Sequence, residues 1–115
     1  MNLNEEEIVG VDAPIEIDLN ALKSEEMNED HMKMLGNKIK WILQRMFGGS
    51  SIPIKIKGSR RDVSAFARTI GREKDFLQSY MKFGMDSNRT KVNRYKLEQA
   101  ISKFKNLTGI GWPFR

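Results

Sequence analysis

Two short segments that alternate apolar and charged residues constrain the fold more than any other feature of this sequence. In APIEIDL, isoleucine and leucine alternate with Glu16 and Asp18, and in SIPIKIKG, isoleucine alternates with Lys55 and Lys57. A period of two is typical of a strand with one buried face. If the two strands pair, the acids of one would face the lysines of the other, which stabilises a sheet.

The alternation predicts strands at about 14–19 and 52–57. Between them, apolar residues recur at steps of three and four, which indicates a helix at about 28–47; these residues are Met32, Leu35, Ile39, Ile42 and Met46. Strand, helix and strand in this order permit a crossover with parallel pairing. Antiparallel pairing stays open.

The second half of the chain predicts further helices. Ser59 precedes Arg60 and Asp62 in the spacing of a capping box, so a helix should begin at Arg60. Gly71 interrupts the apolar pattern, which leaves two alternatives: helices at about 60–70 and 73–83, or one helix over 60–83. A last helix, at about 91–107, should end at Gly109.

Apolar spacing also predicts which helical residues are buried. The expected core residues are Val63, Phe66, Ala67, Ile70, Phe76, Leu77, Tyr80, Met81, Leu97, Ala100, Ile101 and Phe104, with Val92 as a further candidate. We expect Trp112 and Phe114 to dock on their own domain, because large aromatic rings gain most from burial. The fold class is therefore α+β, mostly helical, with two short strands and three or four helices.

Charge is distributed unevenly along the 115 residues. Up to His31 there are ten acids and one base, a net charge of −9, whereas the rest holds nineteen bases and five acids, a net charge of +14. Residues 1–11 are acidic and poor in large apolar groups, which predicts a mobile arm, and 12–115 would form a single basic domain. No apolar run suits a membrane span or a signal peptide, so we expect a cytoplasmic protein.

The residue types disfavour catalysis. The chain has no cysteine and one histidine, His31, and its acids match no metal-binding spacing. We therefore expect a protein that is not an enzyme, with no catalytic residue, no metal and no cofactor.

A candidate binding site lies where the lysine-rich strand runs into the next helix. The start of this helix, with Ser59, Arg60 and Arg61, could hold an anion, because free amides and the helix dipole favour negative charge there. The segment FARTIGREKDFLQSYM resembles a helix-turn-helix, whose second helix would enter the major groove of DNA. The residues expected to contact nucleic acid are Lys55, Lys57, Arg60, Arg61, Arg68, Arg72, Lys74, Gln78 and Lys82.

The expected partner is the phosphate backbone of DNA or RNA, since a basic body attracts polyanions. The alternative is a structural or assembly module that binds an acidic protein surface or forms a homo-oligomer. In the C-terminal half, GMDSNRT, YKLEQAISKF and TGIGWPF resemble short uncharacterised accessory proteins of tailed phages. That resemblance implies a phage-encoded protein of the host cytoplasm and no particular activity.

Overall fold

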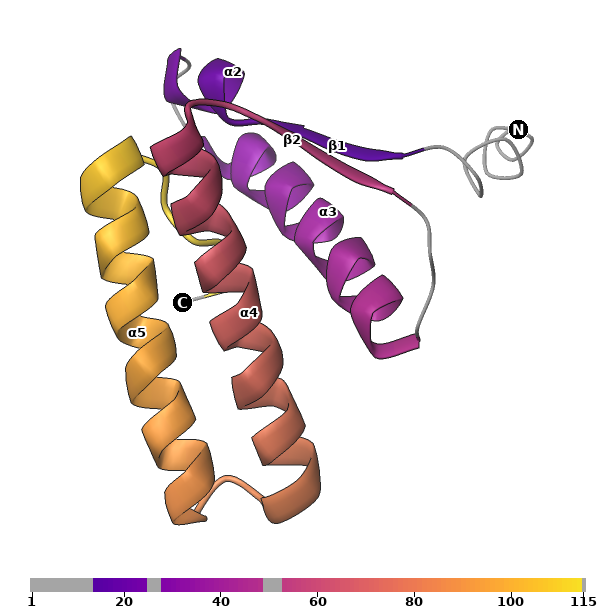
Figure 1. The fold of residues 1–115 in the computed structure, drawn as a ribbon, viewed down its shortest axis with the longest axis vertical. Coiled ribbons are helices and arrows are strands. Elements are labelled where there is room, and N and C mark those ends of the chain that lie inside the picture. Colours follow the sequence, from indigo (N-terminus) through magenta and orange to yellow (C-terminus); the bar gives the residue numbers. More distant parts are fainter. Residues whose placement is uncertain (1–13, 25–27, 49–52, 115) are drawn as a thin grey trace.

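The computed structural model describes residues 14–24, 28–48 and 53–114. Along the chain the elements are β1 (Ile15–Asp18), α2 (Leu19–Ser24), α3 (Glu29–Gly48), β2 (Ile54–Lys57), α4 (Arg60–Phe83) and α5 (Asn88–Thr108) (Figure 1). This order confirms a mostly helical α+β fold with two short strands. The proposed acidic arm at 1–11 lies outside the described residues, as does Ile52.

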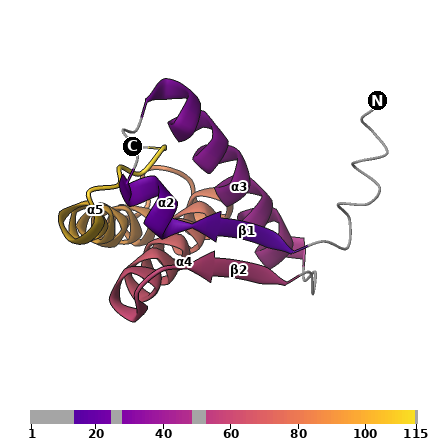
Figure 2. The same ribbon diagram turned by 90° about the horizontal axis from the view of Figure 1, so that it is seen from above.

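The two strands pair in parallel, and Figure 2 shows both arrows pointing the same way. Their register sets Glu16 opposite Lys55 and Asp18 opposite Lys57, which confirms the expected pairing of acids with lysines. The strand Ile15–Asp18 buries both of its isoleucines against the helices, whereas Ile54 of the second strand is 37% exposed.

Helix α2 was not predicted from the sequence. Its six residues are too few to display a helical period, and it follows β1 without a break. Asp18 starts it, because its Oδ1 accepts a hydrogen bond from the backbone nitrogen of Ala21 at 3.2 Å. Leu19, which the alternation places in the strand, is fully buried as the first residue of α2.

Residues 60–83 form one continuous helix, so the helix-turn-helix interpretation of residues 66–81 is wrong. A glycine inside a helix costs only about 1 kcal/mol. Phe66 and Ile70 before Gly71, and Phe76 after it, are all buried, and this burial outweighs that cost. The helix ends at Gly84, whose φ of +86° suits glycine and is strained for other residues.

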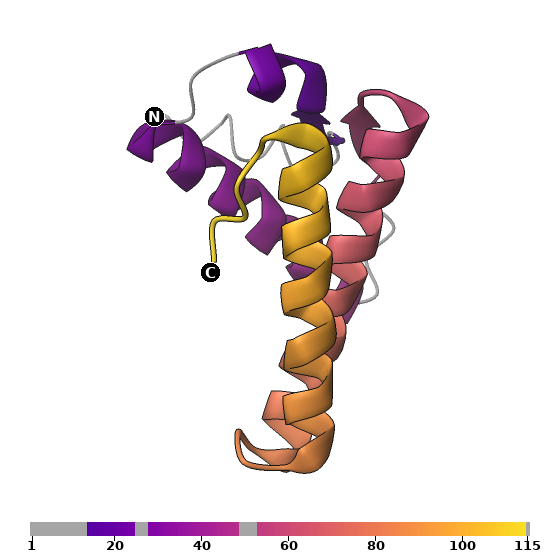
Figure 3. The same ribbon diagram turned by 90° about the vertical axis from the view of Figure 1, so that its left-hand side faces the viewer.

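Helices α4 and α5 run side by side as an antiparallel hairpin, the lower half of which extends beyond α3 (Figures 1 and 3). Ser87 caps α5 by accepting from the backbone nitrogen of Thr90 at 3.1 Å, so α5 begins three residues before the predicted position. Because this half of the hairpin is thinly covered, Tyr80, Met81 and Val92 are 45%, 66% and 52% exposed, and their predicted burial is wrong. The predicted burial is also wrong for Met46 at the end of α3, which is 37% exposed, and for Ala67 of α4, which is exposed.

The core contains three aromatic rings from different segments. The ring centroid of Phe66 lies 5.8 Å from that of Phe104 and 5.7 Å from that of Trp112. The ring centroids of Phe104 and Trp112 lie 5.8 Å apart. Figure 3 shows the C-terminal tail turning back from α5 and running down beside it. The predicted docking of Trp112 on its own domain is therefore confirmed.

None of the described helices is long and apolar enough to cross a membrane.

Candidate functional site

The strand-to-helix junction holds five of the predicted binding residues. Lys55 and Lys57 are exposed, but their register positions lie opposite Glu16 and Asp18, so part of their charge is offset. Ser59 is the N-cap of α4, and its hydroxyl accepts from the backbone nitrogen of Asp62 at 3.1 Å. The capping function of Ser59 is confirmed.

Asp62 occupies the first turn of α4 in the interior of the protein. Its Oδ2 accepts a hydrogen bond from Nζ of Lys23 at 2.8 Å. This hydrogen bond, helped by the charge of Lys23, holds the pKa of Asp62 below its ordinary value, although burial acts in the opposite direction. The helix start therefore already has a negative charge beside its amides, which makes it less favourable for a further anion.

Arg60 and Arg61 are exposed beside this buried carboxylate. The positive end of the helix dipole does not favour them, so they add charge to the surface without building a defined anion site.

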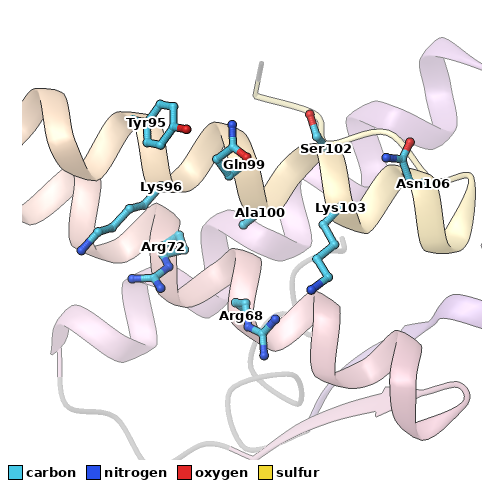
Figure 4. A pocket seen from close by; sticks show the side chains of 9 residues that line it. All are labelled: Arg68, Arg72, Tyr95, Lys96, Gln99, Ala100, Ser102, Lys103 and Asn106. Atoms are coloured by element: carbon cyan, nitrogen blue, oxygen red, sulfur yellow. The ribbon is translucent and has the colours of Figure 1, made fainter.

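A different group of cations gathers on the outer face of the α4–α5 hairpin. A hollow of about 400 Å³ lies between the two helices, and we call it the proximal hollow. Arg68 and Arg72 line it from α4, and Figure 4 shows Lys96 and Lys103 reaching toward them from α5. Its other lining residues are Tyr95, Gln99, Ala100, Ser102 and Asn106, so no acid within 14–24, 28–48 or 53–114 lines it.

Local packing explains why this hollow exists. Thr69 is fully buried between the helices, and its hydroxyl donates to the backbone oxygens of Ala65 at 2.8 Å and Ala100 at 3.4 Å. Ala100 has the smallest side chain that lines the hollow, while long cationic side chains rise on either side. A small residue flanked by long ones leaves a concave surface.

A second hollow, of about 620 Å³, lies farther along the same hairpin, and we call it the distal hollow. Gln78 and Lys82, both predicted, line it together with Arg89 and the half-buried Asn93. Asp75 is the one acid of the described residues that lines it. The others are Phe47, Ser79, Met81 and Phe83.

Helical spacing makes the two hollows neighbours. On α4, Arg72 of the proximal hollow and Asp75 of the distal one are three residues apart. On α5, Asn93 and Lys96 are likewise three residues apart. Residues at this separation lie next to one another on a helix face. The two hollows are therefore adjacent along the hairpin, and we call them together the seam groove. On α5, Arg89 and Lys103 lie about 21 Å apart along the helix axis.

The structure divides the predicted nucleic-acid residues between the strand-to-helix junction, which holds four of them, and the seam groove, which holds four others. Arg68, Arg72, Gln78 and Lys82 lie in the seam groove, and Lys74 lines neither hollow. Sequence analysis missed Arg89, Lys96 and Lys103, because the last helix was analysed only for its apolar face. Their spacing of seven residues, which repeats every two helical turns, was the available signal.

In the part of the chain that the structure describes, no group of three or more histidine, cysteine, aspartate or glutamate side chains could hold a metal ion. His31, Asp18 and Lys38 line a separate hollow of about 310 Å³ between β1, α2 and α3, which is otherwise apolar.

No family model, no curated protein and no solved structure matches this chain.

Proposed function

We propose that the protein binds the phosphate backbone of a nucleic acid in the seam groove and catalyses no reaction. One observation carries the proposal: Arg68, Arg72, Lys96 and Lys103 line one hollow, and none of the acids among the described residues lines it. Four like charges so arranged repel one another, and a polyanion relieves that repulsion. Such contacts position a nucleic acid without reading its sequence.

Two features support the seam groove over the strand-to-helix junction as the centre of binding. The lysines of β2 are set against acids, and the first turn of α4 contains Asp62. Among the described residues that line the seam groove there are six cations and one acid, Asp75; the cations are Arg68, Arg72, Lys82, Arg89, Lys96 and Lys103.

A pair of variants with the same net charge tests the proposal. The groove variant changes Arg68, Arg72, Lys96 and Lys103 to Gln. The control variant changes four exposed lysines that line neither hollow to Gln; these are Lys33, Lys40, Lys91 and Lys105. Fluorescence anisotropy with a labelled oligonucleotide at ~50 mM salt measures the affinity. We expect the groove variant to bind at least about fourfold more weakly than the control, since four exposed charge pairs contribute about 0.2–1 kcal/mol each. Equal affinities would reject the seam groove as the binding site.

A second candidate function is a structural or assembly module, as a homo-oligomer or with an acidic protein partner. It is favoured by the large apolar side chains exposed at the far end of the hairpin, among them Met81, Phe83 and Met85. Exposed apolar groups that gather in one region commonly mark a contact with protein. Sedimentation velocity of the wild type and of Met81→Gln/Met85→Gln would detect self-association through this end.

A phage origin, which remains a prediction from the sequence of the C-terminal half, would fit either function. Under the nucleic-acid proposal, the protein would act in the cytoplasm of the infected host, where phage and host nucleic acids are both present.

A further inference from the structure

We infer that the nucleic acid taken by the seam groove is single-stranded, with bases stacked on Tyr95 and Phe83. The inference rests on the proposed function and specifies its ligand. It starts from a feature that phosphate binding alone does not require: exposed aromatic rings among the groove's cations.

Tyr95 belongs to the proximal hollow and is 62% exposed, on the same helix face as Gln99 and next in sequence to Lys96. An aromatic ring left this open, beside a cation, offers one flat surface to a base while the cation meets the adjoining phosphate.

Phe83 holds the equivalent position in the distal hollow. Its ring is 44% exposed, with Nζ of Lys82 at 5.4 Å and Cζ of Arg89 at 5.1 Å from its centroid. Both cations lie over this ring, so a base that stacks on Phe83 would displace one of them, and the displaced cation would then meet the adjoining phosphate.

The alternation of cations and aromatic rings along the seam groove favours a single strand over a duplex as the ligand. In a duplex the faces of the bases are covered by their neighbours, so neither ring could stack without extruding a base at a cost of a few kcal/mol. A single strand already presents its base faces. The groove's length of about 21 Å suits several nucleotides, because consecutive nucleotides of a stacked strand rise about 3.4 Å along the helix axis.

The test compares labelled oligo(dT), oligo(U) and a DNA duplex of the same length, with Tyr95→Leu, Tyr95→Phe, Phe83→Leu and Phe83→Tyr. The leucine variants should weaken binding of the single strands by roughly 5- to 140-fold each, which corresponds to about 1–3 kcal/mol of stacking per base. The conservative variants keep a ring and should bind like the wild type. Comparison of oligo(dT) with oligo(U) assigns DNA or RNA as the ligand.

Two results would overturn the inference: duplex binding as tight as single-strand binding, or leucine variants that bind oligo(dT) and oligo(U) with wild-type affinity. Should Phe83→Leu fail to fold, Tyr95→Leu decides, because Tyr95 is largely exposed and its replacement leaves the core intact. If the proposed function itself were wrong, the result would be distinguishable, because neither the single strands nor the duplex would bind to the protein.

Discussion

The indole nitrogen of Trp112 donates a hydrogen bond to Oε1 of Glu73 at 3.0 Å, and both side chains are buried. This bond joins the C-terminal tail to the middle of α4, on the side of the hairpin where Phe66 and Phe104 pack. A buried carboxylate is costly unless it is hydrogen-bonded. The tail therefore satisfies a polar group in the core and at the same time closes that core.

We predict that Trp112→Phe lowers the free energy of unfolding by about 1–3 kcal/mol, since a ring remains but the donor to Glu73 is removed. Urea denaturation measures the change. In a double-mutant cycle with Glu73→Met, which removes the acceptor, the two residues should be coupled by at least about 0.5 kcal/mol. Additive effects would mean that the bond contributes nothing beyond packing.

We predict that Lys23→Met destabilises the fold by about 1–3 kcal/mol at neutral pH, because it leaves the buried Asp62 carboxylate without its cation. The matched change Lys33→Met, on the exposed side of α3, should cost less than about 0.5 kcal/mol. Equal costs for the two variants would contradict the account of this ion pair.

The same ion pair predicts a dependence on pH. The folded-state pKa of Asp62 lies below its ordinary value of 3.8, so the ionised group stabilises the fold above pH 3.8, and this contribution is lost as pH falls through the folded-state value. The stability difference between wild type and Lys23→Met should therefore shrink in acid. Thermal melts at neutral and acidic pH measure it, and a constant difference would exclude ionised Asp62 as the cause.

We predict that Gly71→Ala stabilises the protein by about 0.5–1 kcal/mol. Gly71 lies inside α4, and no atom comes within 4 Å of an added Cβ apart from its chain neighbours and the helix's own backbone, so alanine gains helix propensity without a clash. Gly84→Ala is the contrasting change and should destabilise the protein, because Gly84 has a φ of +86°, which is strained for alanine. A loss of stability in Gly71→Ala would favour a turn at this position.

The sequence predicted the helices and strands whose apolar residues recur periodically. It failed where the packing of neighbouring elements decides the strand direction or the burial of a helix face. Alternation located both strands and the pairing of Glu16 with Lys55, and Ser59 marked the start of α4. Parallel pairing could not be predicted, because two strands and a helix permit either direction. The exposure of Tyr80 and Met81 was missed for a similar reason: apolar spacing identifies a helix face but not whether another element covers it.

The candidate site was predicted only in part, because it forms between two helices. Arg68 and Arg72 were identified on α4, whereas their partners Lys96 and Lys103 come from α5, about thirty residues later in the chain. Charge density along the sequence favoured the strand-to-helix junction. It could not reveal that the lysines there lie opposite acids, or which cations converge across the hairpin.

The salt dependence of oligonucleotide binding tests the central claim most directly. The logarithm of the binding constant should fall linearly with the logarithm of salt concentration, and Arg68→Gln/Arg72→Gln should reduce the magnitude of that slope by about two units, roughly one for each phosphate that the variant no longer neutralises. The matched change Lys33→Gln/Lys40→Gln should leave the slope as in the wild type. Equal slopes for the two double variants, or no binding at ~50 mM salt, would contradict phosphate binding in the seam groove.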